Sequence, residues 1–189
     1  LLTGCGSSSQ PLARISAVEG KVDARAESTE TFVAAKVDMQ LKHQGAVRTD
    51  KESSAALEDL ARKGSVKIAP DSYYEVRAGV TLGFHGAGKA VFNVNKQQTE
   101  IQIETPHGNT AVLGTKFGQL ISSDSFELWV EEGTVEFTAR DGSKQRVTGS
   151  QKLQWQVQQG PLPQPVSINL LESEEFFGSR DESFKFNTR

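Results

Sequence analysis

The chain has 189 residues, with 24 acidic against 21 basic side chains and a formal net charge of −3 at pH 7. It has no basic run and no interleaving of aromatic with basic residues, which argues against nucleic-acid binding. No stretch approaches the ~20 consecutive apolar residues that a bilayer-spanning helix requires. The length predicts one domain and is compatible with two small lobes.

The lone cysteine of the chain, Cys5, follows Leu2-Thr3-Gly4 and precedes a Gly/Ser-rich stretch. An aliphatic residue, two small residues and a cysteine resemble the lipobox of bacterial lipoproteins, where the signal peptide is cleaved and the cysteine is lipidated. The resemblance predicts that residues 1–4 are a signal-peptide remnant and residues 5–14 a lipidated tether. A catalytic cysteine would need a base held nearby, and a disulfide within the chain has no second cysteine. An incidental thiol is the remaining alternative.

Apolar and polar residues alternate with period two over most of residues 15–158, the pattern of strands with one buried face. The alternation is clearest in residues 22–25, 66–68, 74–78, 90–94, 101–104, 126–130 and 134–137. Turn residues separate these segments, around Gly20, Gly45, Gly64, Asp71, Gly108, Gly133 and Gly142. Short strands punctuated this regularly predict an all-β domain over residues 15–158, arranged as a sandwich, barrel or solenoid.

Two segments depart from this alternation. Residues 50–62 are compatible with a helical turn, but Ala55-Ala56-Leu57 and Leu60 also fit a short strand. Residues 159–189 are interpreted as a Pro-rich boundary followed by a short helical or extended tail. Within it, residues 167–177 carry a cap, an apolar pair and early acidic residues before Gly178, which predicts a short helix. Residues 180–189, with Phe184 and Phe186 alternating, either dock as an edge strand or stay loose.

Residues 86–137 carry a succession of motifs that is more specific than any single strand. The motifs are Gly88-Lys89-Ala90-Val91-Phe92-Asn93-Val94, Thr105-Pro106, Gly114-Thr115-Lys116-Phe117 and Gly133-Thr134-Val135. This succession resembles the FecR domain, and the similarity extends over about residues 15–154. The resemblance implies an all-β, FecR-like solenoid or sandwich of many short strands.

The residues that carry the resemblance are expected to be structural. Gly114 and Gly133 suit tight backbone positions, and Pro106 suits a strand edge or bulge. Phe92 and Phe117 are predicted core residues. Where the family often has Asp-Gly-Ser, this chain has Lys63-Gly64-Ser65, and Gly64 is expected to supply a positive φ to a turn.

In iron-uptake signalling, FecR-type proteins join a cytoplasmic anti-sigma segment, a transmembrane helix and a periplasmic β domain. They pass a signal from an outer-membrane receptor to a sigma factor. A lipid on Cys5 holds a domain to one leaflet and carries no signal through the membrane, so we expect only the extracytoplasmic binding module to be retained. The resemblance thus implies a non-enzymatic envelope lipoprotein, attached to the membrane through Cys5, with a protein partner. Gly6 after the cysteine resembles an outer-membrane sorting context, which favours the outer membrane or its periplasmic face.

Two other patterns suggest chemistry but are interpreted as structural. Residues 83–90 approximate a phosphate-binding loop, yet Ala90 stands where a hydroxyl must hold Mg²⁺ and a strand follows in place of a helix. No nucleotide or other cofactor is therefore expected. His43, His85 and His107 lack metal-ligand spacing, and the glycines beside His85 and His107 predict surface turns.

The acidic pairs Glu131-Glu132 and Glu174-Glu175 are interpreted as solvated, because adjacent strand residues point to opposite faces and do not converge on a substrate. Trp129, Trp155 and Tyr73-Tyr74 are predicted core residues. If exposed, these aromatic side chains would form a carbohydrate platform. Binding of cell-wall polysaccharide is therefore the alternative function, and an enzyme with a deep polar pocket is a third.

Overall fold

The computed structural model describes residues 10–59 and 64–178. In these ranges the chain forms seventeen strands and one helix. The strands before the middle of the chain are β1 (Ala13–Glu19), β2 (Val22–Arg25), β3 (Val33–Ala34), β4 (Gln40–Leu41), β5 (Ala46–Thr49), β6 (Ser54–Asp59), β7 (Gly64–Ile68) and β8 (Tyr73–Val76). The later elements are β9 (Thr81–Val94), β10 (Ile101–Thr105), β11 (Gly108–Val112), β12 (Thr115–Ile121), β13 (Ser125–Glu132), β14 (Thr134–Ala139), β15 (Lys144–Thr148), β16 (Gln151–Gln156), β17 (Val166–Ser167) and α1 (Leu170–Phe177).

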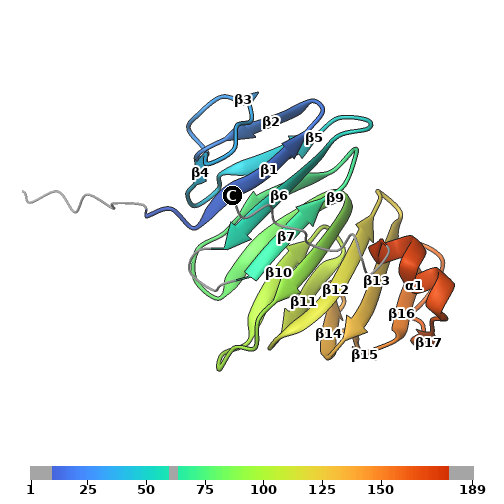
Figure 1. Cartoon of the computed structure of the whole chain (residues 1–189). Coiled ribbons are helices and arrows are strands. Elements are labelled where there is room, and N and C mark those ends of the chain that lie inside the picture. The colour runs from blue at the N-terminus through green and yellow to red at the C-terminus, as the bar shows by residue number, and fades with distance from the viewer. Residues whose placement is uncertain (1–9, 60–63, 179–189) are drawn as a thin grey trace, which may run out of the picture.

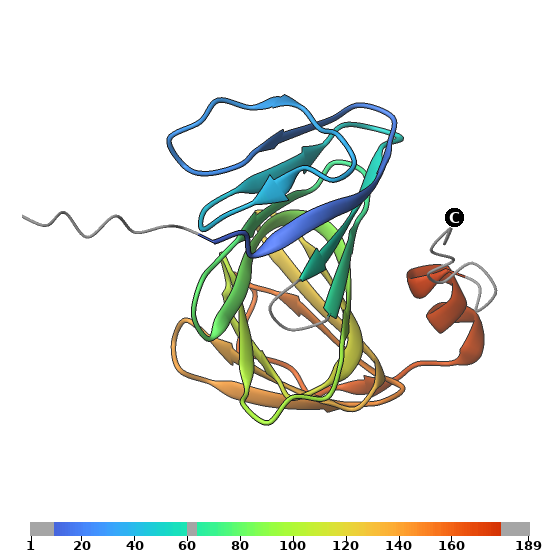
Figure 2. The same cartoon turned by 60° about the vertical axis from the view of Figure 1, so that its left-hand side comes forward.

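The strands form two layers that share β9. Sheet A has the order β4-β1-β6-β7-β9-β12-β13-β16-β17. Sheet B has the order β3-β2-β5-β8-β9-β10-β11-β14-β15. All these pairings are antiparallel except that of β9 with β10. Figures 1 and 2 show the strands stacked from β2 and β3 at one end to β14–β17 and α1 at the other.

The long strand β9 passes from one layer to the other at a glycine pair. Its first half pairs with β8 and β10, and its second half pairs with β7 and β12. Gly88 has φ +77° at the crossing, and a Cβ there would lie 2.2 Å from Ser72 Oγ. Only glycine tolerates both a positive φ and such a close neighbour, because it has no Cβ. Residues 83–90, which approximate a phosphate-binding loop, are therefore part of a strand.

The main hydrophobic core contains residues of both layers. Phe92 of β9 and Phe117 of β12 are fully buried, with ring centroids 4.8 Å apart, which confirms both as core residues. Phe126 of sheet A stacks on Phe137 of sheet B with centroids 4.1 Å apart. Burial of each such ring stabilises the fold by about 1.5–3 kcal/mol relative to exposure.

The glycine expectations hold at two positions and fail at one. Gly133 has φ +85° and Gly114 has φ +152°, and a Cβ at either would approach a neighbour within 2.5 Å. Gly64, in contrast, opens β7 without a positive φ, so the prediction of a turn glycine there was wrong. Pro106 lies in the turn between β10 and β11, where Thr105 pairs with Gly108, and not at a strand edge or bulge.

The structure decides between the alternatives for the two irregular segments. Ser54–Asp59 form strand β6, so the strand alternative is confirmed over the helical turn, while Leu60 lies outside the described residues. The short C-terminal helix is confirmed and begins at Leu170. It starts later than predicted because Val166–Ser167 pair with β16 as β17 and Asn169 provides the N-cap. Residues 180–189 lie outside the described residues.

Candidate interaction surface on sheet A

The predicted lipidation site, Cys5, lies outside the described residues. Within residues 10–59 and 64–178, no group of three His, Asp or Glu side chains is placed to hold a metal ion. The helix found in the same part of the chain is too short to cross a membrane. The groups that remain as candidates for a site are the buried polar side chains and the outer faces of the two sheets.

The expectation that the glycine-flanked histidines lie in surface turns was wrong for His85, whereas His107 lies in a turn as predicted but is buried there. His85 is fully buried and His107 is 7% exposed. His85 is buried because residues 81–94 run through the core as β9, so its neighbouring glycines bend a strand and do not form a turn. His107 Nε2 donates to the Ser122 carbonyl at 2.7 Å. His43 is exposed, and its Nδ1 accepts from the Ala78 amide at 3.0 Å.

His85 belongs to a polar chain inside the core. Its Nδ1 lies 3.2 Å from Gln119 Oε1, and Gln119 Nε2 donates to Thr110 Oγ1 at 2.6 Å. Because Gln119 Oε1 can only accept, Nδ1 carries the proton, and Nε2 has no hydrogen-bond partner among the described residues. Burial lowers the pKa of His85 to about 4, against the smaller opposing effect of its bond to Gln119. The neutral ring is therefore a buried structural group, out of reach of a substrate.

The aromatic residues do not form an open carbohydrate platform. Tyr74 and Trp155 lie in the main core, which confirms their interpretation as packing residues, and Trp155 Nε1 donates to the Gly160 carbonyl at 3.0 Å. Trp129 is 7% exposed, under α1. Tyr73 is half-buried, and its hydroxyl donates to Glu75 at 2.9 Å.

The acidic pairs have different surroundings. Glu131 lies 2.6 Å from Lys116, and its side chain is only 16% exposed, so its interpretation as solvated was wrong. Glu132 is exposed at the end of β13. Glu174 and Glu175 are exposed on α1, as expected for solvated residues.

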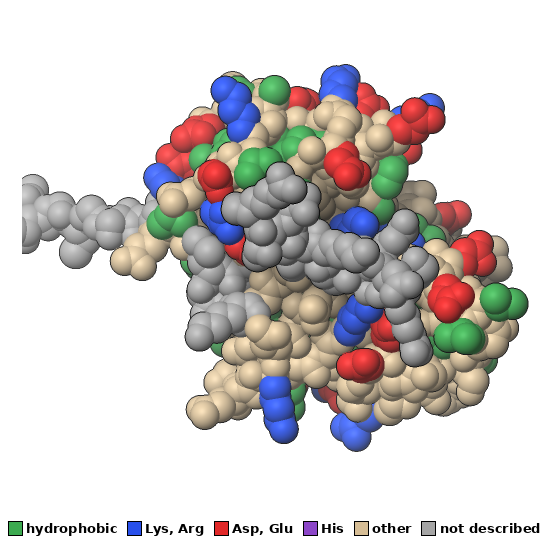
Figure 3. Space-filling view, in the orientation of Figure 1, with side chains coloured by type: hydrophobic (Ala, Val, Ile, Leu, Met, Phe, Trp, Pro, Cys, Tyr) green, Lys and Arg blue, Asp and Glu red, His purple; other side chains and the backbone are tan. Residues whose placement is uncertain are grey.

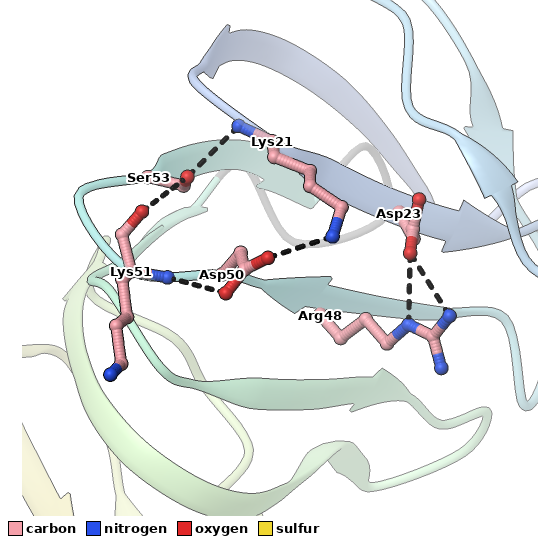
Figure 4. Close-up of polar contacts among 6 residues, drawn as sticks. All are labelled: Lys21, Asp23, Arg48, Asp50, Lys51 and Ser53. Carbon is pink, nitrogen blue, oxygen red and sulfur yellow. Dashed lines mark hydrogen bonds and ion pairs between the residues drawn. The ribbon is translucent and has the colours of Figure 1, made fainter.

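The two outer sheet faces differ in how their charges are satisfied. Toward β2 and β5, Arg48 donates twice to Asp23, at 2.9 and 3.1 Å, and Lys21 pairs with Asp50 at 2.8 Å (Figure 4). Figure 4 also shows Ser53 accepting from the Lys21 amide. These two pairs neutralise one another's charges locally.

A second ion-pair cluster on sheet B is also closed. The Glu75 carboxylate accepts from Arg25 at 3.2 Å and from the Tyr73 hydroxyl, and it lies 2.8 Å from Arg77. Burial raises the pKa of Tyr73, and its hydrogen bond to Glu75 adds to the effect. With three donors on one carboxylate, this cluster orders the sheet face.

The outer face of sheet A is built as a row across five strands. Neighbouring strands place Lys67, Val91, Gly118, Trp129 and Lys152 side by side, in that order. The row has an apolar centre, a residue without a side chain in its middle and a lysine at each end. Helix α1 lies on this face, alongside β13 and β16 (Figure 1).

Phe176 of α1 fills the centre of the row. Its ring stacks on Trp129 with centroids 4.6 Å apart and planes inclined by 14°. The ring rests on Gly118, where a Cβ would lie 2.3 Å from Phe176 Cε1. Phe176, Trp129 and Val91 form a buried cluster that is separate from the main core, with Ile168 and Phe177 packed against it.

Lysines of the sheet bind both ends of α1. At the N-terminus, Asn169 and Glu172 form a capping box, and Lys152 Nζ lies 2.6 Å from Glu172. Bonds from Lys152 and from the Asn169 amide lower the pKa of Glu172. At the C-terminus α1 has no basic residue, and Lys89 donates to the Phe176 carbonyl and lies 4.2 Å over its ring. Burial lowers the pKa of Lys89, and the charge of Lys67 adds to this.

Open grooves adjoin both ends of the helix. The groove at the N-terminal end has a volume of about 480 Å³ and is lined by residues that include Lys116, Glu131 and Ser173. The groove at the C-terminal end has a volume of about 460 Å³ and is lined by Lys67, Pro70 and Phe177 among others. Over α1 the surface shows acidic and hydrophobic side chains together (Figure 3). The arrangement can bind a helix, and it brings no nucleophile and base together.

The fold defines a two-layer, largely antiparallel β domain with one helix on its outer face. A family model described as FecR protein matches residues 27–136, more than half of the 189 residues. The chain therefore belongs to the FecR family, which confirms the identification made from the motifs in residues 86–137.

The fold is also found in two crystal structures of a protein from Parabacteroides distasonis described as a "putative anti-sigma factor". Each superposes with a TM-score of 0.59 at 14% sequence identity, over 68% of this chain. The chain spans 62% of the length of those structures, and at this identity the likeness shows the fold alone. The comparison with curated protein sequences gave no match.

Proposed function

We propose that this chain is a non-enzymatic, lipid-anchored protein of the bacterial envelope whose FecR domain binds a protein partner as a sensory or assembly module. The observation that carries the proposal is the family match over residues 27–136. The structural neighbour described as a "putative anti-sigma factor" supports a role in signalling. The lipobox-like Leu2-Thr3-Gly4-Cys5 supports attachment through a lipid on Cys5, at the outer membrane or its periplasmic face.

The described residues support binding over catalysis. The buried His85 is held by Gln119 inside the core, and the carboxylate of Glu75 is bonded to Arg25, Arg77 and Tyr73. The burial of Trp129 and Trp155 speaks against a polysaccharide platform made of these residues. A protein partner is better supported, because the outer face of sheet A already holds a helix through an aromatic stack and contacts from lysines.

Lipid anchoring is tested by comparing the natural chain with a Cys5→Ser variant, both expressed from the natural gene and labelled with a palmitate analogue. The natural chain is expected to carry the label and to sediment with membranes, and Cys5→Ser to lose the label and become soluble. A Ser7→Ala variant is the matched control and should behave as the natural chain. Membrane retention of Cys5→Ser, or an unlabelled natural chain, would contradict the anchor.

The binding role is tested by cross-linking in intact cells, followed by capture of the natural chain from detergent extracts. Specific recovery of an envelope protein, absent from cells without the chain, is expected. Tight binding to purified cell-wall glycan, with no protein recovered, would overturn the proposal in favour of a polysaccharide binder.

A further inference from the structure

We propose that the outer face of sheet A is an exchangeable helix-binding site, which α1 occupies in the resting chain. A protein partner would displace α1 with an acidic helix of its own that carries an aromatic residue in the place of Phe176. This inference rests on the proposed protein-binding function and adds the chemistry of the partner. The proposal requires three conditions. The main core must be complete without α1, α1 must be weakly bound, and the face must favour one kind of helix over others.

The main core is complete without α1. The buried residues that join the two layers include none from the helix, whereas Phe176 belongs to the small separate cluster with Val91 and Trp129. Leu162, in the segment before the helix, packs against the main core. The connection that would swing is therefore residues 163–169, which the two-residue strand β17 and single bonds at Pro163 and Ile168 join to the rest of the domain. Release of α1 would expose Trp129 and leave the β domain folded.

Helix α1 is short, and a single buried side chain anchors it to the sheet. It is eight residues long, and isolated helices shorter than ~12–15 residues are marginal in water. Phe176 is its only buried residue, while Leu170 and Leu171 are 58% and 77% exposed on its outer side. The helix therefore depends on the sheet for its stability, and a better-fitting segment can compete for the same contacts.

The contacts of α1 define what the site accepts. Lys152 binds a carboxylate in the first turn, at Glu172, and the aromatic ring follows four residues later, on the same side of the helix. Gly118 leaves space for that ring, and Lys89 donates to the Phe176 carbonyl at the end of the helix. An acidic helix with a Glu-x-x-x-Phe spacing satisfies all of these contacts. A basic helix would place like charges against the lysines, and a purely aliphatic helix would leave them without a carboxylate partner.

The test uses a peptide with the sequence of residues 166–178, acetylated, amidated and labelled, titrated into the purified full chain. In the natural chain the tethered α1 competes at high effective concentration, so weak binding is expected. In a Phe176→Ala variant the peptide should bind at least about tenfold more tightly. Emission of Trp129 should shift to the red in this variant and return when the peptide binds. The same peptide with its own Glu172→Lys change should not bind.

Two matched variants separate the site from general effects. Gly118→Ala, added to Phe176→Ala, should abolish peptide binding while the far-ultraviolet circular dichroism stays unchanged. The new Cβ would lie 2.3 Å from the position of the incoming ring, whereas its nearest backbone atom, the Ala90 carbonyl oxygen, is 3.3 Å away. Leu171→Ala, on the exposed side of α1, should leave peptide binding to the natural chain unchanged.

The proposal is overturned if the peptide does not bind a folded Phe176→Ala chain, or if binding is indifferent to Gly118→Ala. Loss of the folded β domain in Phe176→Ala equally overturns it, because the site must persist without α1. The assay contains no envelope component, so its failure is distinguishable from failure of the proposed function. If the cell experiment recovers a partner but the peptide fails, the partner binds elsewhere.

Discussion

Lowering the pH from about 7.5 to about 5 is expected to destabilise the chain through His85. The ring is fully buried, and its pKa falls from 6.5 to about 4 in the folded state. Below pH 6.5 the unfolded chain gains a proton that the folded chain does not take until about pH 4. The contribution of the neutral His85 ring to the free energy of unfolding is therefore fully present above pH 6.5, and it is lost as the pH falls toward the pKa of the folded state. Over the roughly 1.5 units between 6.5 and 5, the loss is about 2 kcal/mol.

The assay is urea unfolding at the two pH values, for the natural chain and for His85→Gln. Glutamine can keep the bond to Gln119 but does not titrate, so the pH-dependent loss of unfolding free energy should be about 2 kcal/mol smaller in this variant. His43→Gln, on the surface, should lose as much as the natural chain. Carboxylates with lowered pKa values, such as Asp50, lose their stabilisation at lower pH, and their effect cancels in the comparison. Equal losses in His85→Gln and the natural chain would show that the titration of His85 does not set the pH dependence.

Two further pairs of variants, compared by urea unfolding, are expected to differ in how much unfolding free energy they lose. Gly133→Ala should destabilise by at least about 1 kcal/mol more than Gly142→Ala, because both have φ near +85° but only at Gly133 would the Cβ meet a neighbour, 2.4 Å away. Equal costs would show that the backbone alone sets the penalty. Glu75→Gln should lose about 2 kcal/mol or more, because it disturbs three buried or half-buried donors, against about 0–1 kcal/mol for the surface change Glu136→Gln. A loss at Glu75 no larger than that at Glu136 would show that the cluster on sheet B contributes little.

Much of the fold follows from local sequence pattern. Alternation in residues 126–130 predicts a strand with Phe126 and Leu128 inward, and Gly133 predicts the tight turn that follows. The same local reasoning fails at His85, because a glycine beside a residue signals either a turn or a bend within a strand. Which one forms depends on β7, β8, β10 and β12, the strands that pair with β9, and these pairings join distant segments.

The helix of the candidate site was predictable, but its binding face was not. Capping residues and Gly178 mark α1, whereas the row beneath it comes from five strands spread over residues 67–152. One local signal was present in the sequence. Trp129 alternates with the inward Leu128 and Val130, so it falls on the polar side of β13 together with Glu127 and Glu131. An aromatic residue at such a position indicates that another element covers it.

Native-state hydrogen exchange of the natural chain tests most directly whether α1 is a separable occupant of sheet A. The amides of Ser173 and Gly178 are bonded within the helix and its cap, and those of β12 within the central sheet. If α1 is separable, the amides of Ser173 and Gly178 exchange by local opening. Their opening free energy is then well below that of the β12 amides, and urea hardly changes it. If α1 opens only at the global unfolding free energy, with the same dependence on urea, the helix belongs to one cooperative unit. That result would contradict the exchangeable site.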